Sequence, residues 1–93
     1  MADNVVEINV EVKNSDGLHM RPAMQFVDIA SQFNSKVTVC NDETQVDGKS
    51  IMHMTMLAAT QGTKLKIITA GDDAQKAADA LYDLVEVKMF NEK

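Results

Sequence analysis

Hydrophobic residues change their spacing along this chain, and each change marks an expected element. Apolar residues occupy every second position from Val6 to Val12, which predicts a half-buried strand. From Pro22 to Phe33 the spacing lengthens to three and four residues, as in a helix with one apolar face. The turn-forming residues 14–17 separate the two segments, so the chain is expected to begin with a strand, a turn and an amphipathic helix.

The rest of the chain continues to alternate between the two periods. The predicted elements are, in order, a strand around Val37 and Val39, a strand at 44–47, a helix at 50–59, a strand around Leu65 and Ile67, and a helix from Ala74 to Lys88. Asp47 or Ser50 can cap the helix at 50–59, and the acidic residues at 72–73 suit the positive end of the last helix dipole. The order β-α-β-β-α-β-α predicts an α+β fold, in which helices cover one face of an antiparallel sheet.

Size and charge narrow the class of protein. The 93 residues suit one domain, so residues 1–93 are expected to fold as a single unit. A net charge of −5 argues against a nucleic-acid-binding face, which is normally basic. Apolar runs are too short to span a bilayer, so no membrane insertion is expected. Cys40 is the only cysteine, which excludes an internal disulfide and suits a half-buried strand residue in a reducing cytoplasm.

The segment DGLHMRPA, residues 16–23, carries the most informative chemistry. Gly17 permits a tight turn, and Pro22 suits the first turn of a helix because its missing N–H costs nothing there. His19 therefore stands where free helix N–H groups and the helix dipole favour an anion, and Arg21 adds a planar phosphate partner. This pattern predicts transient phosphohistidine chemistry. The plainer alternative is that His19 only caps or packs at the helix start.

A second segment, GKSIM at residues 48–52, supports two interpretations of Ser50. As an N-cap residue it would only satisfy the first N–H groups of the following helix. As a phosphorylation site it would place a dianion at a helix start, where negative charge is tolerated. His53, in the same helix, is expected to face solvent, and its pairing with His19 as a metal site has no support from ligand spacing.

Methionine is more frequent than one small core requires. Met54 is assigned to the core, whereas other methionines are candidates for a flexible partner-binding surface. The expected docking patch beside His19 consists of Met20, Met24, Ile51 and Met52.

The segments NSDGLHMRPA (residues 14–23) and GKSIM resemble the HPr family, the small phosphocarriers of the sugar phosphotransferase system. The resemblance extends from about Val5 to Val87. It implies an open-faced β-sandwich, with a four-stranded antiparallel sheet covered on one face by three helices. It also implies that His19 accepts a phosphoryl group on Nδ1 from enzyme I and passes it to the IIA domains of sugar permeases. Arg21 would contact the phosphate.

The same resemblance implies regulation at Ser50. This serine matches the position that an ATP-dependent HPr kinase phosphorylates in many Gram-positive bacteria, which permits binding to a catabolite-control repressor. A carrier of this kind is a cosubstrate and not an enzyme, and it uses no cofactor or metal. A cytoplasmic monomer is therefore expected. The family usually has alanine in place of Met20, glycine in place of His53, and methionine or leucine in place of Thr55, which bears on partner choice.

Two other functions remain as alternatives. One is a regulatory interaction module, in catabolite or nitrogen control, that is switched by phosphorylation at Ser50. The other is a small anion sensor that uses the same helix start as His19.

Overall fold

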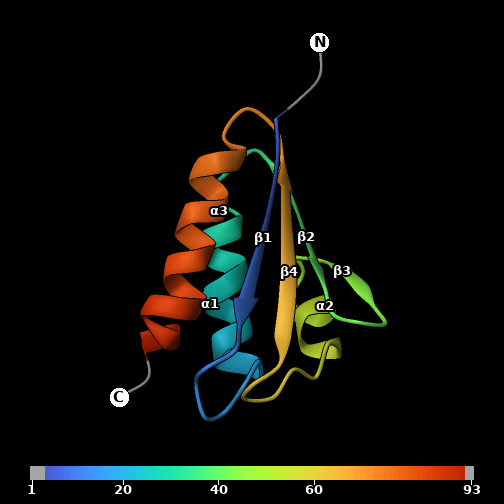
Figure 1. The fold of residues 1–93 in the computed structure, drawn as a ribbon, viewed down its shortest axis with the longest axis vertical. Helices are drawn as coiled ribbons and strands as arrows, with labels where there is room; N and C mark the ends of the chain where they lie inside the picture. Colours follow the sequence, from blue (N-terminus) through green and yellow to red (C-terminus); the bar gives the residue numbers. More distant parts are fainter. Residues whose placement is uncertain (1–3, 92–93) are drawn as a thin grey trace.

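The structure, a computed structural model, describes residues 4–91, and the ends of the expected domain, 1–3 and 92–93, lie outside the described residues. Within 4–91 the chain forms four strands and three α-helices (Figure 1). These are β1 (Val5–Glu11), α1 (Met20–Ala30), β2 (Lys36–Cys40), β3 (Gln45–Asp47), α2 (Ile51–Met56), β4 (Lys64–Ala70) and α3 (Ala74–Tyr82). The predicted α+β order of strands and helices is confirmed.

The strands form one antiparallel sheet in the order β1-β4-β2-β3. Because β4 pairs with both β1 and β2, the latter two strands run parallel with β4 between them. Residue pairing places Ile67 of β4 opposite Ile8 on one side and Val39 on the other. The connection β1-α1-β2 therefore passes over β4, and the connection β3-α2-β4 passes over β2. The two connections interleave.

The core lies between the sheet and the helices. Alternate strand residues such as Val39 and Ile67 are fully buried, as the period-two pattern predicts. The helices pack against one face of the sheet: α3 lies over β1 and β4, α1 lies next to α3, and α2 contacts α1 and β3 (Figure 1). Phe26 from α1, Met54 from α2 and Leu81 from α3 are at most 1% exposed, so all three helices contribute to the core.

Helix α1 begins and ends earlier than the spacing predicts. It starts at Met20, so Pro22 is its third residue, where the missing N–H still has no helical partner to lose. It ends at Ala30, because the chain tightens into a turn in which Phe33 N donates to Ala30 O at 3.3 Å. Phe33 is consequently a half-buried turn residue and not part of the helix.

Helix α2 is also shorter than predicted. Of the two candidate caps, Ser50 is the one used: its Oγ accepts a hydrogen bond from His53 N at 3.2 Å. The Asp47 carboxylate accepts from Lys49 N at 2.9 Å instead. The helix ends at Met56, and two residues later Ala58 adopts a left-handed backbone with φ of 49°.

The carboxylate at the start of α3 binds a different segment of the chain and not its own helix. Asp73 is the N-cap residue of α3, yet its side chain makes no capping bond there. Its oxygens accept hydrogen bonds from Asn34 N at 2.9 Å, from Ser35 N at 2.9 Å and from the Ser35 hydroxyl. The pKa of Asp73 is lowered, most strongly by the hydrogen bond from the Ser35 hydroxyl and next by the one from Asn34 N. Asp73 thus fixes the α1–β2 turn against α3.

Beyond Tyr82 the helical path continues as a wider π-helical turn (Asp83–Val87) and a 3₁₀ turn (Met89–Asn91). Glu86 fixes this region to the first strand: its Oε2 accepts from Glu11 N at 2.7 Å, and its Oε1 lies 2.6 Å from Lys13 Nζ. Phe90 is 1% exposed, so the final turn also contributes to the core.

Candidate functional site

The turn that leads to His19 is fixed by close backbone contacts. The Asn14 amide donates to Gly17 O at 2.9 Å, and Leu18 N donates to Ala59 O at 2.9 Å. Gly17 has a φ of +69°, and a Cβ there would lie 2.4 Å from Ala59 O, so only glycine fits. The turn is therefore held against the segment that follows α2, which sets the position of His19.

His19 is the N-cap residue of α1. Its backbone is extended, with φ of −85° and ψ of −164°, and its carbonyl accepts from Ala23 N at 3.0 Å. Over half of the His19 side chain is exposed, and its ring makes no capping hydrogen bond to α1. Nε2 lies 3.4 Å from Asp16 Oδ2. The ring thus has Nε2 beside a carboxylate, and Nδ1 is the other nitrogen.

The backbone around the ring favours negative charge. Met20 and Arg21 are the first two residues of α1, so their N–H groups have no partner within the helix. Together with the helix dipole, these groups favour an anion at the helix start, where His19 lies. An imidazole in this setting can act as a nucleophile toward an anionic group and hold that group afterwards.

Arg21 is exposed and is held by a contact that the sequence analysis did not identify. With the Gln25 amide oriented to match its neighbours, its oxygen accepts from Arg21 Nη1 at 2.7 Å. The amide nitrogen then donates to Phe90 O at 3.1 Å. Gln25 therefore links the guanidinium to the buried C-terminal turn.

His19 borders a shallow pocket of about 320 Å³ between the start of α1 and the end of α2. Its lining includes Met20, Thr55, Ala58 and Thr60. The structure thus brings His19 together with residues of a distant segment, and no local sequence signal identifies them. Asp16 is different, because it stands three residues before His19 within the segment already identified as informative.

Ser50 lies at the other end of α2 from Thr55, about 8 Å along the helix axis at the standard rise per residue. It is half-buried, and it does not line the pocket at His19. His53, next to it in the helix, is exposed as predicted, and its Nδ1 accepts from Asp47 N at 3.4 Å. The His19 and Ser50 positions are therefore two separate sites joined by α2.

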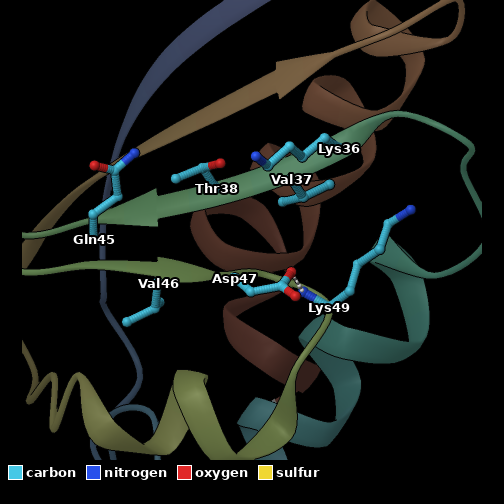
Figure 2. A pocket seen from close by; sticks show the side chains of 7 residues that line it. All are labelled: Lys36, Val37, Thr38, Gln45, Val46, Asp47 and Lys49. Atoms are coloured by element: carbon cyan, nitrogen blue, oxygen red, sulfur yellow. Dashed lines mark hydrogen bonds between the residues drawn. The ribbon is translucent and has the colours of Figure 1, made fainter.

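A larger pocket of about 560 Å³ lies on the β2–β3 hairpin and contains none of the predicted site residues. Figure 2 shows its lining, with Lys49 hydrogen-bonded to Asp47 through the backbone and its side chain extending away from that carboxylate. The Lys49 ammonium is already engaged, since Nζ donates to Phe33 O at 2.7 Å. This pocket is separate from the chemistry at His19.

The four residues of the predicted docking patch, Met20, Met24, Ile51 and Met52, are all exposed. Met54 is fully buried and belongs to the core, as predicted. Met56, which the sequence analysis did not place in the patch, is also exposed. Cys40 is half-buried and unpaired, as expected for a strand residue.

Within residues 4–91, no helix is long and apolar enough to cross a membrane. No group of three or more histidine, cysteine, aspartate or glutamate side chains in that range is placed to hold a metal ion.

Comparison with known proteins gives consistent matches over most of the chain. A family model described as the PTS HPr component phosphorylation site matches residues 6–87. The phosphocarrier protein HPr of Neisseria meningitidis serogroup A is 44% identical over 77 residues, which is 83% of this chain and 86% of the relative. The HPr-like protein Crh of Halalkalibacterium halodurans is 42% identical, over 88% of this chain and 98% of the relative. The crystal structure of HPr-C-His from Thermoanaerobacter tengcongensis superposes with a TM-score of 0.87 at 43% identity, covering 95% of this chain and 98% of that one.

Proposed function

Because this chain belongs to the HPr family of phosphocarriers of the phosphotransferase system, we propose that His19 is the residue that carries the phosphoryl group. HPr proteins are phosphocarriers and not catalysts, so the chemistry needs a nucleophile and an anion site more than a catalytic apparatus. The observation that carries this proposal is the position of His19, exposed at the N-cap of α1 with Nε2 beside Asp16.

The transfer step follows from this placement. Nδ1 of His19 attacks the phosphorus of a phosphohistidine on the donor, a new N–P bond forms, and the donor nitrogen leaves with the electron pair of the broken bond. The proton on Nε2 stays in place, so the His19 ring gains positive charge as the phosphoryl group arrives. The Asp16 carboxylate, 3.4 Å from Nε2, counterbalances that charge and favours the tautomer with a free Nδ1.

The phosphoryl oxygens would be stabilised by groups at the start of α1. The N–H groups of Met20 and Arg21, with the helix dipole, contribute roughly 0.3–1 kcal/mol, up to about 2 when partly buried. The Arg21 guanidinium adds a charged partner, and Gln25 holds it close to the helix. This modest stabilisation suits a group that must be passed on and not retained.

The partners follow from the family role and the exposed surface. We expect phosphorylated enzyme I as the donor and IIA domains of sugar permeases as acceptors. Both would dock on the exposed side chains of Met20, Met24, Ile51 and Met52. We also propose that residues 1–93 act as a single domain and as a monomer in the cytoplasm. The unpaired thiol of Cys40 supports only the last point, a reducing compartment.

Phosphorylation of Ser50 is a second proposed level of control. A phosphoserine there would place a dianion beside the Asp47–Lys49 turn and next to Ile51 and Met52 of the docking patch. Docking partners would have to desolvate that charge, which would slow phosphoryl transfer. The similarity to Crh, described as the Bacillus subtilis catabolite repression HPr, supports a regulatory alternative, in which modification by an HPr kinase promotes binding to a catabolite-control repressor.

The decisive experiment incubates the protein with enzyme I, Mg²⁺ and phosphoenolpyruvate and measures intact mass and acid lability. We expect one acid-labile phosphoryl group, absent in His19→Ala and retained in the matched control His53→Ala. If the enzyme I phosphorylates another HPr but leaves this protein unmodified, the carrier proposal is wrong. Parallel incubation with HPr kinase and ATP tests Ser50, where Ser50→Ala should lose an acid-stable group.

A further inference from the structure

The exposed methionines of the described chain are gathered on the two helices that border His19. Within residues 4–91, four methionine side chains are exposed, and each is close to half exposed or more: Met20 at 57%, Met24 at 46%, Met52 at 71% and Met56 at 66%. Met54 is fully buried, and Met89 is partly buried. We refer to the four exposed residues as the methionine surface.

Helical spacing explains how these side chains form one surface. Met20 and Met24 are four residues apart on α1, and Met52 and Met56 are four residues apart on α2, so each pair shares a helix face. Helices α1 and α2 pack against each other. Met20 lines the pocket that contains His19, and Thr55 brings α2 to the same pocket. The methionine surface therefore lies on the two helices that border this pocket.

We propose that the methionine surface is a site of reversible oxidation, at which peroxides convert thioethers to sulfoxides and weaken the docking of phosphotransfer partners. This inference rests on the proposed carrier function. A thioether sulfur attacks one peroxide oxygen and the O–O bond breaks. The sulfur loses two electrons as the S–O bond forms, and the peroxide is reduced to water. A dithiol reductant reverses the change by removing the oxygen as water while its thiols form a disulfide.

The position of the methionine surface decides the consequence of oxidation. A thioether is apolar and adapts its shape to different partners, whereas a sulfoxide is a strong hydrogen-bond acceptor. Docking would bury that acceptor against an apolar partner surface, where its lost hydration is not replaced. The His19 ring keeps its nitrogens, so oxidation would act on docking and leave the nucleophile intact. Met54 is shielded by the core, so the fold would persist.

The test treats the purified protein with dilute hydrogen peroxide, follows sulfoxide at each methionine by peptide mass spectrometry, and checks folding by circular dichroism. Phosphoryl transfer from phosphorylated enzyme I is then compared before and after treatment. We expect sulfoxide on the methionine surface before Met54, and a transfer rate constant about tenfold lower, equivalent to about 1.4 kcal/mol. Treatment with methionine sulfoxide reductase and thioredoxin should restore the rate.

Two variants assign the effect to the surface, each compared with its own untreated form. Replacing all four residues of the methionine surface by leucine should remove the sensitivity to peroxide, whereas the matched control Met54→Leu should keep it. An unchanged rate in the oxidised protein, or an equal loss in the four-leucine variant, overturns this inference while the carrier function stands. Failure of the untreated protein to accept a phosphoryl group overturns both.

Discussion

The left-handed backbone at Ala58 predicts that glycine at this position stabilises the protein. Ala58 has a φ of 49° and lines the pocket that contains His19. For a residue with a Cβ, this conformation costs roughly 1–2 kcal/mol, and Ala58→Gly removes that cost. The substitution also gives the unfolded chain more freedom, which costs about 0.4–1 kcal/mol. The relief of strain is the larger effect, so the net gain should be about 0.5–1 kcal/mol.

Urea unfolding at neutral pH measures this gain. With a slope of about 1 kcal/mol per molar urea for a small protein, the midpoint of Ala58→Gly should rise by about 0.5–1 M. The matched control is Ala80→Gly, because Ala80 lies within α3, where glycine should cost about 1 kcal/mol. If Ala58→Gly loses as much stability as the control, Ala58 does not hold the left-handed conformation and the reasoning fails.

Two further predictions concern side chains that connect distant segments. Gln25→Leu removes the acceptor for Arg21 Nη1, so we expect phosphoryl acceptance from enzyme I to slow about threefold to tenfold, whereas Gln75→Leu on α3 should have no effect. Equal rates for the two variants would show that Gln25 does not position Arg21. The pKa of Asp73 is lowered from its ordinary 3.8, so its stabilising contribution is complete above that pH and is lost as the pH falls through the folded-state pKa. Urea midpoints from pH 7 to pH 3 should therefore fall less steeply for Asp73→Asn than for the wild type, and parallel curves would contradict this sign.

The elements themselves were predictable because their patterns depend only on spacing. The apolar stripe of the last helix is buried from Ala74 to Val85. Apolar residues at helical spacing lie on one side of the helix, so that side must face the core. The end of α2 was not predictable. The chain turns at Ala58, near the point where Leu18 N donates to Ala59 O, and this contact joins segments that are remote in sequence.

The candidate site likewise has features that the sequence predicts and features that only the folded structure shows. His19 could be placed at the helix start because Gly17 and Pro22 fix the local geometry around it. The contact of Gln25 with Arg21 and Phe90 O could not, because it forms only when the C-terminal turn packs against α1. The exposure of Met56 was also missed, since the apolar character of a methionine does not show which helix face meets the core.

The central position of β4 has a consequence for how the chain acquires its structure. Strands β1 and β2 have no direct pairing with each other, and β4, which joins them, begins only at Lys64. A nascent chain that has emerged only as far as α2 can form helices and the β2–β3 hairpin, but it cannot close the sheet. The site at His19 shares this dependence, because Ala59, which holds its turn, lies in the segment leading to β4. Synthesis must therefore pass Ala70 before the sheet is complete, and long-range pairing of this kind is expected to set the folding rate.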